Sequence, residues 1–256
     1  MSYLLPRTDD EARRLAIQSE LLREGTERLL DALALRPGAS CLDIGCGTGD
    51  ALALIARRVG PTGRVAGLDL DPAPARARGV DVIAGDLFGD PALDPAGYDL
   101  VFSRYVLHHM PDPAAALARM WQRVRTGGVL AVLDIDQRGT ATCPAWAPYD
   151  QLEAWIAELY ARIGIDNRIG HKLPHLLERA AGPPDGTQVT GVIRTIAELA
   201  ELLPLLLDMV RDPLIAHGVA SAADVARLAA ELATAAQETA VWCYRPTLVA
   251  VWRRKR

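Results

Sequence analysis

The stretch LDIGCGTGD, residues 42–50, decides the fold of this 256-residue chain. The apolar run over 41–44 predicts a short buried strand, which leads into a loop with glycine at every second position. Glycine allows a backbone to turn sharply and to approach a ligand closely. A helix predicted over 50–59 follows, and its first free N–H groups face the loop. The stretch therefore predicts a ligand site between a strand and a helix.

Strands and helices alternate along the chain after this stretch. Apolar segments predict strands over 64–69, 80–84, 98–103 and 129–135 and helices over 50–59 and 113–124. Gly79 follows Pro72 so closely that only a very short helix fits between them. Alternation of apolar strands with helices is typical of a parallel, doubly wound sheet.

The flanking regions predict a further set of elements. Before the glycine loop we expect helices over 8–25 and 27–34. After residue 140 we expect helices over 150–163, 173–180, 199–210 and 222–239, and strands over 187–194 and 241–252.

The composition excludes several classes of protein. The chain is 50% hydrophobic, 23% charged and 5% aromatic, which excludes a disordered, collagenous or disulfide-scaffold protein. A formal net charge of −4 disfavours a nucleic-acid binder. Only two of the 28 basic residues are lysine, and this preference for arginine suggests a GC-rich, bacterial genome.

The cysteines and the apolar segments bear on the location of the protein. The four cysteines form no C-x-x-C pair and have no histidine at ligand spacing, so we expect reduced thiols and no metal. Residues 1–10 lack the apolar core of a signal peptide. The most apolar segment, 199–210, is too short to span a bilayer. We therefore expect a cytoplasmic protein without a membrane segment.

The acidic residues around the glycine loop restrict the ligand. A dinucleotide fingerprint needs a third glycine where Asp50 stands, and an acidic residue there opposes a pyrophosphate. Asp69 ends the second strand, where a carboxylate can accept hydrogen bonds from both hydroxyls of a ribose. Asp86 follows the third strand and can accept from an adenine amino group. The loop therefore favours a ligand without phosphates.

Five motifs in this order resemble those of the class I S-adenosylmethionine-dependent methyltransferases. They are LDIGCGTG (42–49), GLD (67–69), GDL (85–87), YDLVFSRYVLHHMPD (98–112) and RTGGVLAVLD (125–134), and the resemblance covers about residues 37–135. It implies an α/β, Rossmann-like doubly wound sheet, mostly parallel with an antiparallel last strand, plus an α-helical cap. It also implies S-adenosyl-L-methionine as cofactor and S-adenosyl-L-homocysteine as product.

The resemblance assigns cofactor contacts by position. Gly45, Cys46 and Gly47 line the methionine part, and Asp43 lies beneath the loop. Asp69 binds the ribose, and the other contacts lie at the adenine, at the sulfonium or in the N-terminal segment. The remaining expected cofactor residues are Leu70, Asp86, Leu87, Ser103, Arg104, Gln18 and Tyr3.

Candidates for catalysis follow the fourth and fifth strands. His108 and His109 are candidate general bases, but a histidine pair is common there in the family, so a supporting role is an equal alternative. Asp134 and Asp136 are two residues apart and point to one side of the sheet. Asp136 orients a substrate hydroxyl or amine, or else caps a loop.

Aromatic residues after the fifth strand are candidates to contact the acceptor substrate. Trp146 and Tyr149 lie in a segment that often covers the acceptor pocket in the family, and packing between helices is the alternative. His171, next to a predicted loop, is a further substrate candidate.

We expect one structural domain with three regions. Residues 1–36 form an N-terminal helical cap, 37–139 the cofactor-binding core, and 140–256 the lid insertions and final strands. The expected activity is methyl transfer to an O, N or C nucleophile of a small molecule, such as a specialised metabolite, by a monomer or homodimer. The alternatives are non-methylating chemistry such as cyclisation, a cofactor-binding regulator without turnover and, more remotely, a nicotinamide dehydrogenase.

Overall fold

The computed structural model describes residues 9–77, 79–89, 92–94 and 97–256. These residues form two compact units, each assembled from segments far apart in the sequence. We call them the sheet unit and the helical unit. The sheet unit comprises Arg23–Asp136, Arg168–Thr190 and Leu248–Arg256. The helical unit comprises the described residues of Met1–Leu22 together with Gln137–Asn167 and Gly191–Thr247.

The helices, strands and 3-10 turns (η) follow one another in this order: α1 (Asp9–Leu33), β1 (Ser40–Ile44), α2 (Asp50–Val59), β2 (Arg64–Asp69), α3 (Ala73–Arg76), β3 (Val82–Ala84), β4 (Tyr98–Arg104), η1 (Leu107–His109), α4 (Pro113–Gln122), β5 (Val124–Asp136), η2 (Gln137–Gly139), β6 (Ala141–Cys143), α5 (Ala147–Ile163), η3 (Ile169–Lys172), α6 (Leu173–Ala181), β7 (Gly186–Thr190), β8 (Ile193–Thr195), η4 (Ala197–Leu199), α7 (Leu202–Ala216), α8 (Ala222–Leu232), η5 (Ala235–Gln237), β9 (Trp242–Tyr244) and β10 (Thr247–Arg254).

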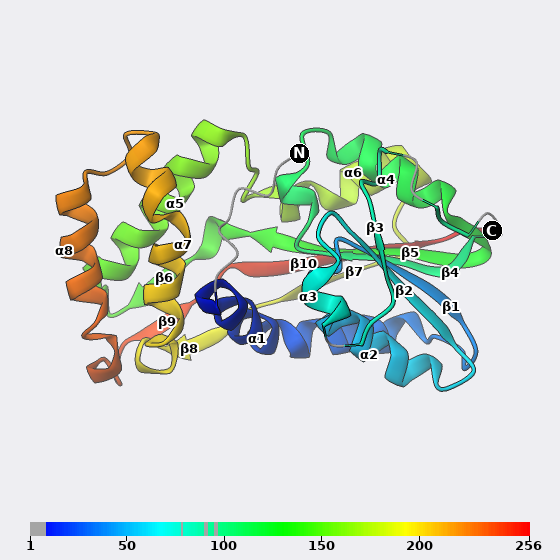
Figure 1. The fold of residues 1–256 in the computed structure, drawn as a ribbon, viewed down its shortest axis with the longest axis horizontal. Coiled ribbons are helices and arrows are strands. Elements are labelled where there is room, and N and C mark those ends of the chain that lie inside the picture. The colour runs from blue at the N-terminus through cyan, green and yellow to red at the C-terminus, as the bar shows by residue number, and fades with distance from the viewer. Residues whose placement is uncertain (1–8, 78, 90–91, 95–96) are drawn as a thin grey trace. The chain divides into compact units, whose positions relative to one another are not determined.

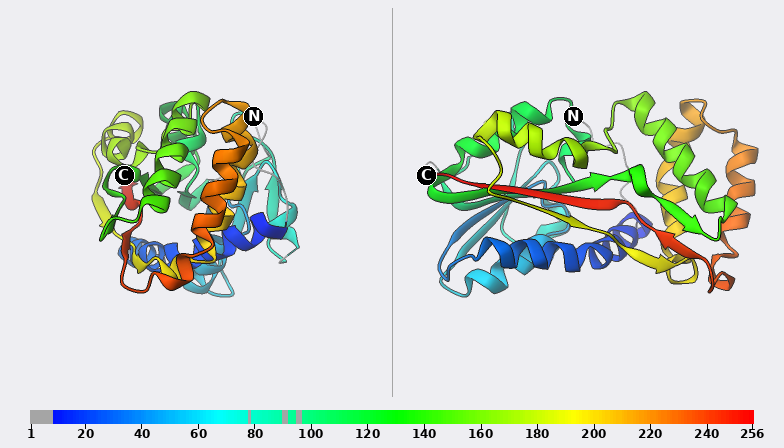
Figure 2. Two further views of the ribbon diagram at one scale, coloured as in Figure 1. Left: turned by 90° about the vertical axis from the view of Figure 1, so that its left-hand side faces the viewer. Right: turned by 180° about the vertical axis from the view of Figure 1, so that it is seen from behind.

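A seven-stranded sheet forms the centre of the sheet unit, with the strand order β3-β2-β1-β4-β5-β10-β7. The pairs β3–β2, β2–β1, β1–β4 and β4–β5 are parallel, whereas β10 runs antiparallel to β7. The view from behind in Figure 2 shows the red β10 running between β5 and β7. The predicted mostly parallel sheet with an antiparallel last strand is thereby confirmed.

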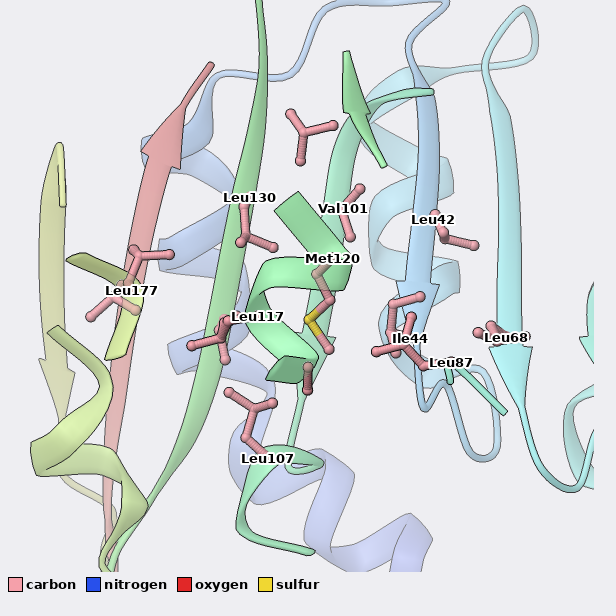
Figure 3. Packing of buried hydrophobic residues seen from close by; sticks show 14 of the residues in the cluster. Leu42, Ile44, Leu68, Leu87, Val101, Leu107, Leu117, Met120, Leu130 and Leu177 are labelled. Carbon is pink, nitrogen blue, oxygen red and sulfur yellow. The ribbon is translucent and has the colours of Figure 1, made fainter. Parts of the chain in front are cut away.

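Helices cover this sheet on both faces. Figure 1 shows α4 and α6 on one face and α2 with the second half of α1 on the other. Leu42, Val101 and Leu130 of the central strands meet Leu117 and Met120 of α4 in one buried cluster (Figure 3). Strands buried on both faces read as nearly continuous apolar runs, which explains why their ranges were predictable. The helix predicted over 50–59 and the strand over 64–69 are confirmed without a change of bounds.

The first helix differs from the prediction. The two helices expected over 8–25 and 27–34 are one continuous helix, α1, and the prediction of a break near Gly25 is wrong. A Cβ at Gly25 would stand 3.1 Å from Leu248 Cδ1 and 3.4 Å from the Thr190 side chain. Glycine is used here because the helix packs closely on β10 and β7, and a turn is not needed.

Two segments predicted as single strands are each divided between the two units. The segment 241–252 becomes β9 and β10, which are separated at Pro246, a residue that has no N–H to donate to a strand ladder. The segment 187–194 becomes β7 and β8. Strands β8 and β9 pair antiparallel in a small sheet of order β6-β9-β8.

The helical unit has its own apolar core. Helices α5, α7 and α8 lie beside one another (Figure 1). They pack around buried side chains that include Tyr149, Leu203 and Leu228. Ser221 caps α8 as predicted, because its hydroxyl accepts a hydrogen bond from the N–H of Asp224 at 3.1 Å. None of the helices in the described ranges has both the length and the apolar character needed to cross a bilayer.

Candidate functional site

The loop between β1 and α2 folds back onto the end of β2. The N–H groups of Gly45 and Cys46 donate to the carbonyl oxygen of Leu68, at 2.7 and 3.3 Å. Gly45, Gly47 and Gly49 have φ angles of 69°, 52° and 81°. These are left-handed conformations that glycine adopts without strain. The predicted sharp turn at the glycines is confirmed.

Gly47 exposes its backbone to an open space beside Asp69. Apart from its chain neighbours, no described atom lies within 4 Å of the point where a Cβ on Gly47 would stand. The Gly47 N–H donates to Asp69 Oδ2 at 2.8 Å, and the Asp71 N–H donates to Asp69 Oδ1 at 2.9 Å. Each carboxylate oxygen can accept a further hydrogen bond. Asp69, half-buried and held by two backbone groups, can therefore bind a pair of hydroxyls.

Asp43 supplies a buried acceptor beneath the loop. Its side chain is buried, and Oδ1 has no hydrogen-bond partner among the described residues. Burial raises the pKa of Asp43 to about 7; the Arg104 guanidinium lowers it, and the Asp69 carboxylate raises it further. A buried acceptor without a partner is costly. A ligand that brings an N–H group to Asp43 would remove this cost.

Ser103 and Arg104 end β4 next to this carboxylate. The Ser103 hydroxyl is buried and donates to the carbonyl oxygen of Ile44 at 3.0 Å, so it joins β4 to β1. Arg104 Nη1 donates to Thr26 Oγ1 at 3.1 Å. Burial lowers the pKa of Arg104, and the charges of Asp43 and Asp50 oppose this change. Arg104 is therefore a half-buried cation among carboxylates.

The ends of β2 and β3 offer one polar and several apolar contacts. Asp86 Oδ1 accepts a hydrogen bond from the N–H of Phe88 at 2.9 Å. The Leu87 side chain is buried in the core, whereas Leu70, directly after Asp69, is 49% exposed. A flat, apolar ring system can pack on such a leucine while its polar edge meets the carboxylate and backbone groups.

The charge at these strand ends favours a neutral or cationic ligand. Asp50 stands in the first turn of α2 and accepts a hydrogen bond from Thr48 Oγ1 at 2.5 Å. A carboxylate at a helix N-terminus occupies the place that a phosphate prefers. Together with Asp43, Asp69 and Asp86 it makes this edge of the sheet acidic.

His108 lies against a buried carboxylate. Asp134, at the end of β5, is fully buried, and its Oδ1 lies 2.7 Å from His108 Nδ1. The ring of His109 is 3.9 Å from that of His108 between centroids. Asp136 is also buried, at the last position of β5.

The pairing of His108 with Asp134 was not predicted. The sequence shows two aspartates on one side of the strand but does not show which of them reaches a histidine. The parallel register, in which Arg104 pairs with Leu133, brings Asp134 level with the turn after β4.

Four other predicted site residues belong to segments of the helical unit: Tyr3, Gln18, Trp146 and Tyr149. Gln18, on α1, accepts a hydrogen bond from Arg14, and Tyr3 lies outside the described residues. Trp146 precedes α5 and is half-buried. Tyr149 is fully buried in the core of the helical unit, and its hydroxyl accepts a hydrogen bond from Arg245 Nη1 at 3.1 Å.

His171 belongs to the sheet unit, in the turn η3, where its side chain is exposed and Nδ1 lies against the carbonyl oxygen of Arg168.

The described ranges contain no group of three or more His, Cys, Asp or Glu side chains that could hold a metal ion.

Comparison with known proteins identifies related sequences. The model of the family described as "Methyltransferase domain" matches residues 13–181. An uncharacterised protein from a Streptomyces fradiae transposon is 33% identical over 69% of this chain and 53% of its own length. The 2-phytyl-1,4-naphtoquinone methyltransferase of Thermosynechococcus vestitus is 33% identical over 53% of this chain and 63% of its own length. The chain thus spans about half the length of the curated relatives it matches.

Comparison with solved structures identifies related folds. A putative methyltransferase from Bacillus halodurans has a TM-score of 0.59 at 16% identity, covering 90% of this chain and 98% of the other. The geranyl diphosphate C-methyltransferase of Streptomyces coelicolor has a TM-score of 0.52 at 16% identity, covering 96% of this chain and 85% of the other. At these identities the similarity concerns the fold.

Proposed function

This chain belongs to the methyltransferase domain family, and from that premise we propose that it transfers the methyl group of S-adenosyl-L-methionine to a small molecule. The nucleophile of the acceptor is an oxygen, nitrogen or carbon atom, and the acceptor is a specialised metabolite. One observation supports the cofactor most directly. Asp43 holds a buried, unpartnered carboxylate oxygen beneath a glycine loop whose Gly47 backbone is open to a ligand.

The residues at the strand ends fit this cofactor. Asp69, held by the N–H groups of Gly47 and Asp71, has acceptor capacity left for the two ribose hydroxyls. Asp43 accepts from the amino group of the methionine part, next to the backbone of Gly45, Cys46 and Gly47. We further assign the remaining cofactor contacts to Leu70, Asp86, Leu87, Ser103, Arg104, Gln18 and Tyr3.

The acidic charge of the site supports a cationic ligand. When bound, the cofactor supplies an electrophilic methyl group on a positively charged sulfur, and the sulfur becomes neutral on transfer. The carboxylates of Asp43, Asp50 and Asp69 favour binding of the positive charge and disfavour a phosphate at the start of α2. The protein then contributes by holding the acceptor in line with the bond to be broken, which is worth about 7–11 kcal/mol in well-oriented systems.

Several features support a small-molecule acceptor. The relatives that carry names include enzymes named for a naphthoquinone, for trans-aconitate and for nocamycin, which are chemically unlike one another. The part of the sequence that these chains share therefore supports binding of a common cofactor. Recognition of the acceptor substrate depends on residues outside that part. Contacts of Trp146, Tyr149 and His171 with the acceptor stay predictions. A catalytic role for His109 or for Asp136 is also still a prediction.

We also propose a cytoplasmic, bacterial enzyme that acts as a monomer or homodimer and binds no nucleic acid. The four free thiols and the formal net charge of −4 support this proposal. Light scattering after size-exclusion chromatography determines the oligomeric state.

A label-transfer experiment tests the function. Purified protein, S-adenosylmethionine with a labelled methyl group and a bacterial cell extract are incubated, and the extract is divided into small molecules and macromolecules. We expect label in the small-molecule fraction, and we expect Asp69→Ala to lower it strongly when the concentration of S-adenosylmethionine does not saturate the variant. Asp112→Ala is the matched control, since that exposed aspartate only caps α4, accepting from Ala115 N–H at 2.9 Å.

Each other outcome of the label-transfer experiment contradicts a part of the proposal. Label in protein or RNA contradicts a small-molecule acceptor. Binding of S-adenosylmethionine without any transfer in extracts of several bacteria favours non-methylating chemistry or a regulatory role. A separate binding measurement tests the cofactor: tighter binding of NAD than of S-adenosylmethionine contradicts the proposal that S-adenosylmethionine is the cofactor.

A further inference from the structure

We propose that Asp134 is a positioning residue that holds His108 as the proton acceptor of the reaction, and that the acceptor substrate is methylated on a hydroxyl group. This inference deepens the proposed function and rests on it. It begins from the pairing of the two side chains at the ends of β4 and β5.

Asp134 orients both the backbone and the ring of the turn after β4. Its carboxylate is fully buried. Oδ2 accepts hydrogen bonds from the N–H groups of Leu107 and His108, at 2.8 and 3.3 Å. Oδ1 lies 2.7 Å from His108 Nδ1 and accepts from the N–H of Ile135 at 2.8 Å. With backbone and ring fixed together, the imidazole has one orientation.

The contact with Asp134 determines which ring nitrogen carries the proton. A carboxylate only accepts hydrogen bonds, so His108 Nδ1 is the donor in this pair. A neutral imidazole carries one proton, and Nε2 is then a bare acceptor. Among the residues that the structure describes, no side chain or backbone group hydrogen bonds to Nε2. The second nitrogen of His108 is therefore available to take a proton.

The turn that carries His108 closes on the glycine loop. A Cβ added to Gly45 would overlap the Val106 side chain, so Val106 packs directly on the loop proposed to hold the methionine part. Tyr105 has a φ of 61°, a strained conformation for a tyrosine, and its ring meets the His108 ring edge-on at 5.6 Å. The imidazole thus belongs to a tightly held segment beside the proposed cofactor loop.

Burial makes the carboxylate necessary for this role. Only 7% of the His108 side-chain surface is exposed, so a proton on Nε2 would leave an isolated buried cation if Asp134 were neutral. With Asp134 ionised, proton transfer creates a buried ion pair that is already hydrogen bonded and oriented. General-base catalysis of this kind contributes about 10²–10⁴-fold to a rate.

A built-in proton acceptor restricts the class of substrate. A carboxylate acceptor is already ionised, and a neutral amine attacks with its own lone pair before it loses a proton. A hydroxyl gains most, because its oxygen becomes a strong nucleophile as the proton leaves. In the step that we propose, the O–H bond breaks, the proton goes to His108 Nε2, and the electron pair left on oxygen forms the bond to the methyl carbon. The bond from that carbon to sulfur breaks with its electron pair on sulfur, and the proton later passes to solvent.

The tautomer of His108 tests the positioning role without any acceptor. Protein labelled with ¹⁵N-histidine is studied by long-range ¹H–¹⁵N correlation at pH 8, and His108→Gln identifies the ring among the five histidines. We expect a protonated Nδ1 and a bare Nε2. In Asp134→Asn an amide N–H takes the place of Oδ1, next to Ile135 N–H and the His108 ring. His108 Nδ1 then has to accept a hydrogen bond, so we expect the ring proton to move from Nδ1 to Nε2. A wild-type ring protonated on Nε2 overturns the proposal.

Kinetics test the base and the substrate class with the acceptor found by label transfer. We expect His108→Gln to lower kcat about 10²–10⁴-fold with little change in the KM of the acceptor. His175→Gln, at an exposed histidine of α6, is the matched control and should change kcat less than about 10-fold. Added imidazole should restore part of the activity of His108→Ala. Label on any atom other than a hydroxyl oxygen, or an undiminished kcat in His108→Gln, overturns the proposal.

The two levels of inference fail separately. If the protein binds S-adenosylhomocysteine and His108→Gln binds it equally well, the cofactor proposal stands whatever the tautomer. If S-adenosylhomocysteine does not bind, the proposed function fails even where the NMR result identifies a bare Nε2.

Discussion

The backbone N–H of Gly47 donates a hydrogen bond to the carboxylate of Asp69 at 2.8 Å. This bond ties the loop after β1 to the end of β2, two neighbouring parallel strands. Asp69 therefore shapes the glycine loop as well as offering acceptors to a ligand.

We expect Asp69→Ala to weaken binding of S-adenosylhomocysteine about 10–100-fold. The variant loses two charge-assisted hydrogen bonds to the backbone and the predicted contacts to the ribose, and each such bond is worth about 1.5–3 kcal/mol. Isothermal titration calorimetry measures the change. Asp112→Ala, the capping control, should lose about 1 kcal/mol of unfolding free energy and keep its affinity.

We expect alanine at Gly45 and at Gly47 to act on different properties. At Gly45 the new Cβ would overlap Val106, so overpacking and a positive φ together should lower the free energy of unfolding by about 2–4 kcal/mol. At Gly47 the Cβ would enter open space, so the stability loss should be about 1–2 kcal/mol while ligand affinity falls more than 10-fold. Urea unfolding and calorimetry measure the two effects.

Val106→Ala provides the matched test of the steric part. When Val106→Ala is combined with Gly45→Ala, the loss of unfolding free energy that comes from overpacking should disappear. The loss that comes from the positive φ at residue 45 should remain. Additive losses in the double variant would contradict a contact between the two residues.

We expect the stability of the protein to decrease as pH rises through the range set by Asp43. The pKa of about 7 in the folded chain is above the ordinary value of about 3.9, so the folded state keeps a proton that the unfolded state loses. The free energy of unfolding should therefore fall between about pH 4 and pH 7, by an amount on the order of a few kcal/mol. Asp43→Asn should remove this contribution.

Urea unfolding of wild type and Asp43→Asn between about pH 3.5 and pH 8, a range that brackets these two pKa values, measures the effect. The variant should gain on the wild type as pH rises, and a difference independent of pH would contradict the assignment. An amino group bound at Asp43 favours the carboxylate, so binding of S-adenosylhomocysteine near pH 6 should release a proton in wild type only.

We expect Tyr149→Phe to destabilise the helical unit by about 1–2 kcal/mol. The change removes the hydroxyl that accepts a hydrogen bond from Arg245 and leaves the buried ring in place. Urea unfolding measures the loss. A rise in the KM of the acceptor without a loss of stability would instead support contact between Tyr149 and the substrate.

The residue pattern alone determined the layout of the sheet unit. The apolar runs, the turn glycines and the order of the five motifs predicted β1, α2, β2 and β4 nearly to the residue, because strands covered on both faces need continuous apolar sequence. The positions of Asp43, Asp69 and the glycines in the candidate site followed from the same pattern. Local sequence contains this information because each of these features depends on a few neighbouring residues.

Only the tertiary structure decided the features that depend on contacts between distant segments. Gly25 stands inside a continuous helix because β10 and β7 pack against it, and the sequence near Gly25 does not contain those strands. Pro246 divides one apolar run between two sheets. Asp134, and not its neighbour two residues later, meets His108 at 2.7 Å because of the register between β4 and β5. The register depends on how all paired residues of the two strands fit together. For this reason no single segment of the sequence specifies which carboxylate reaches the ring.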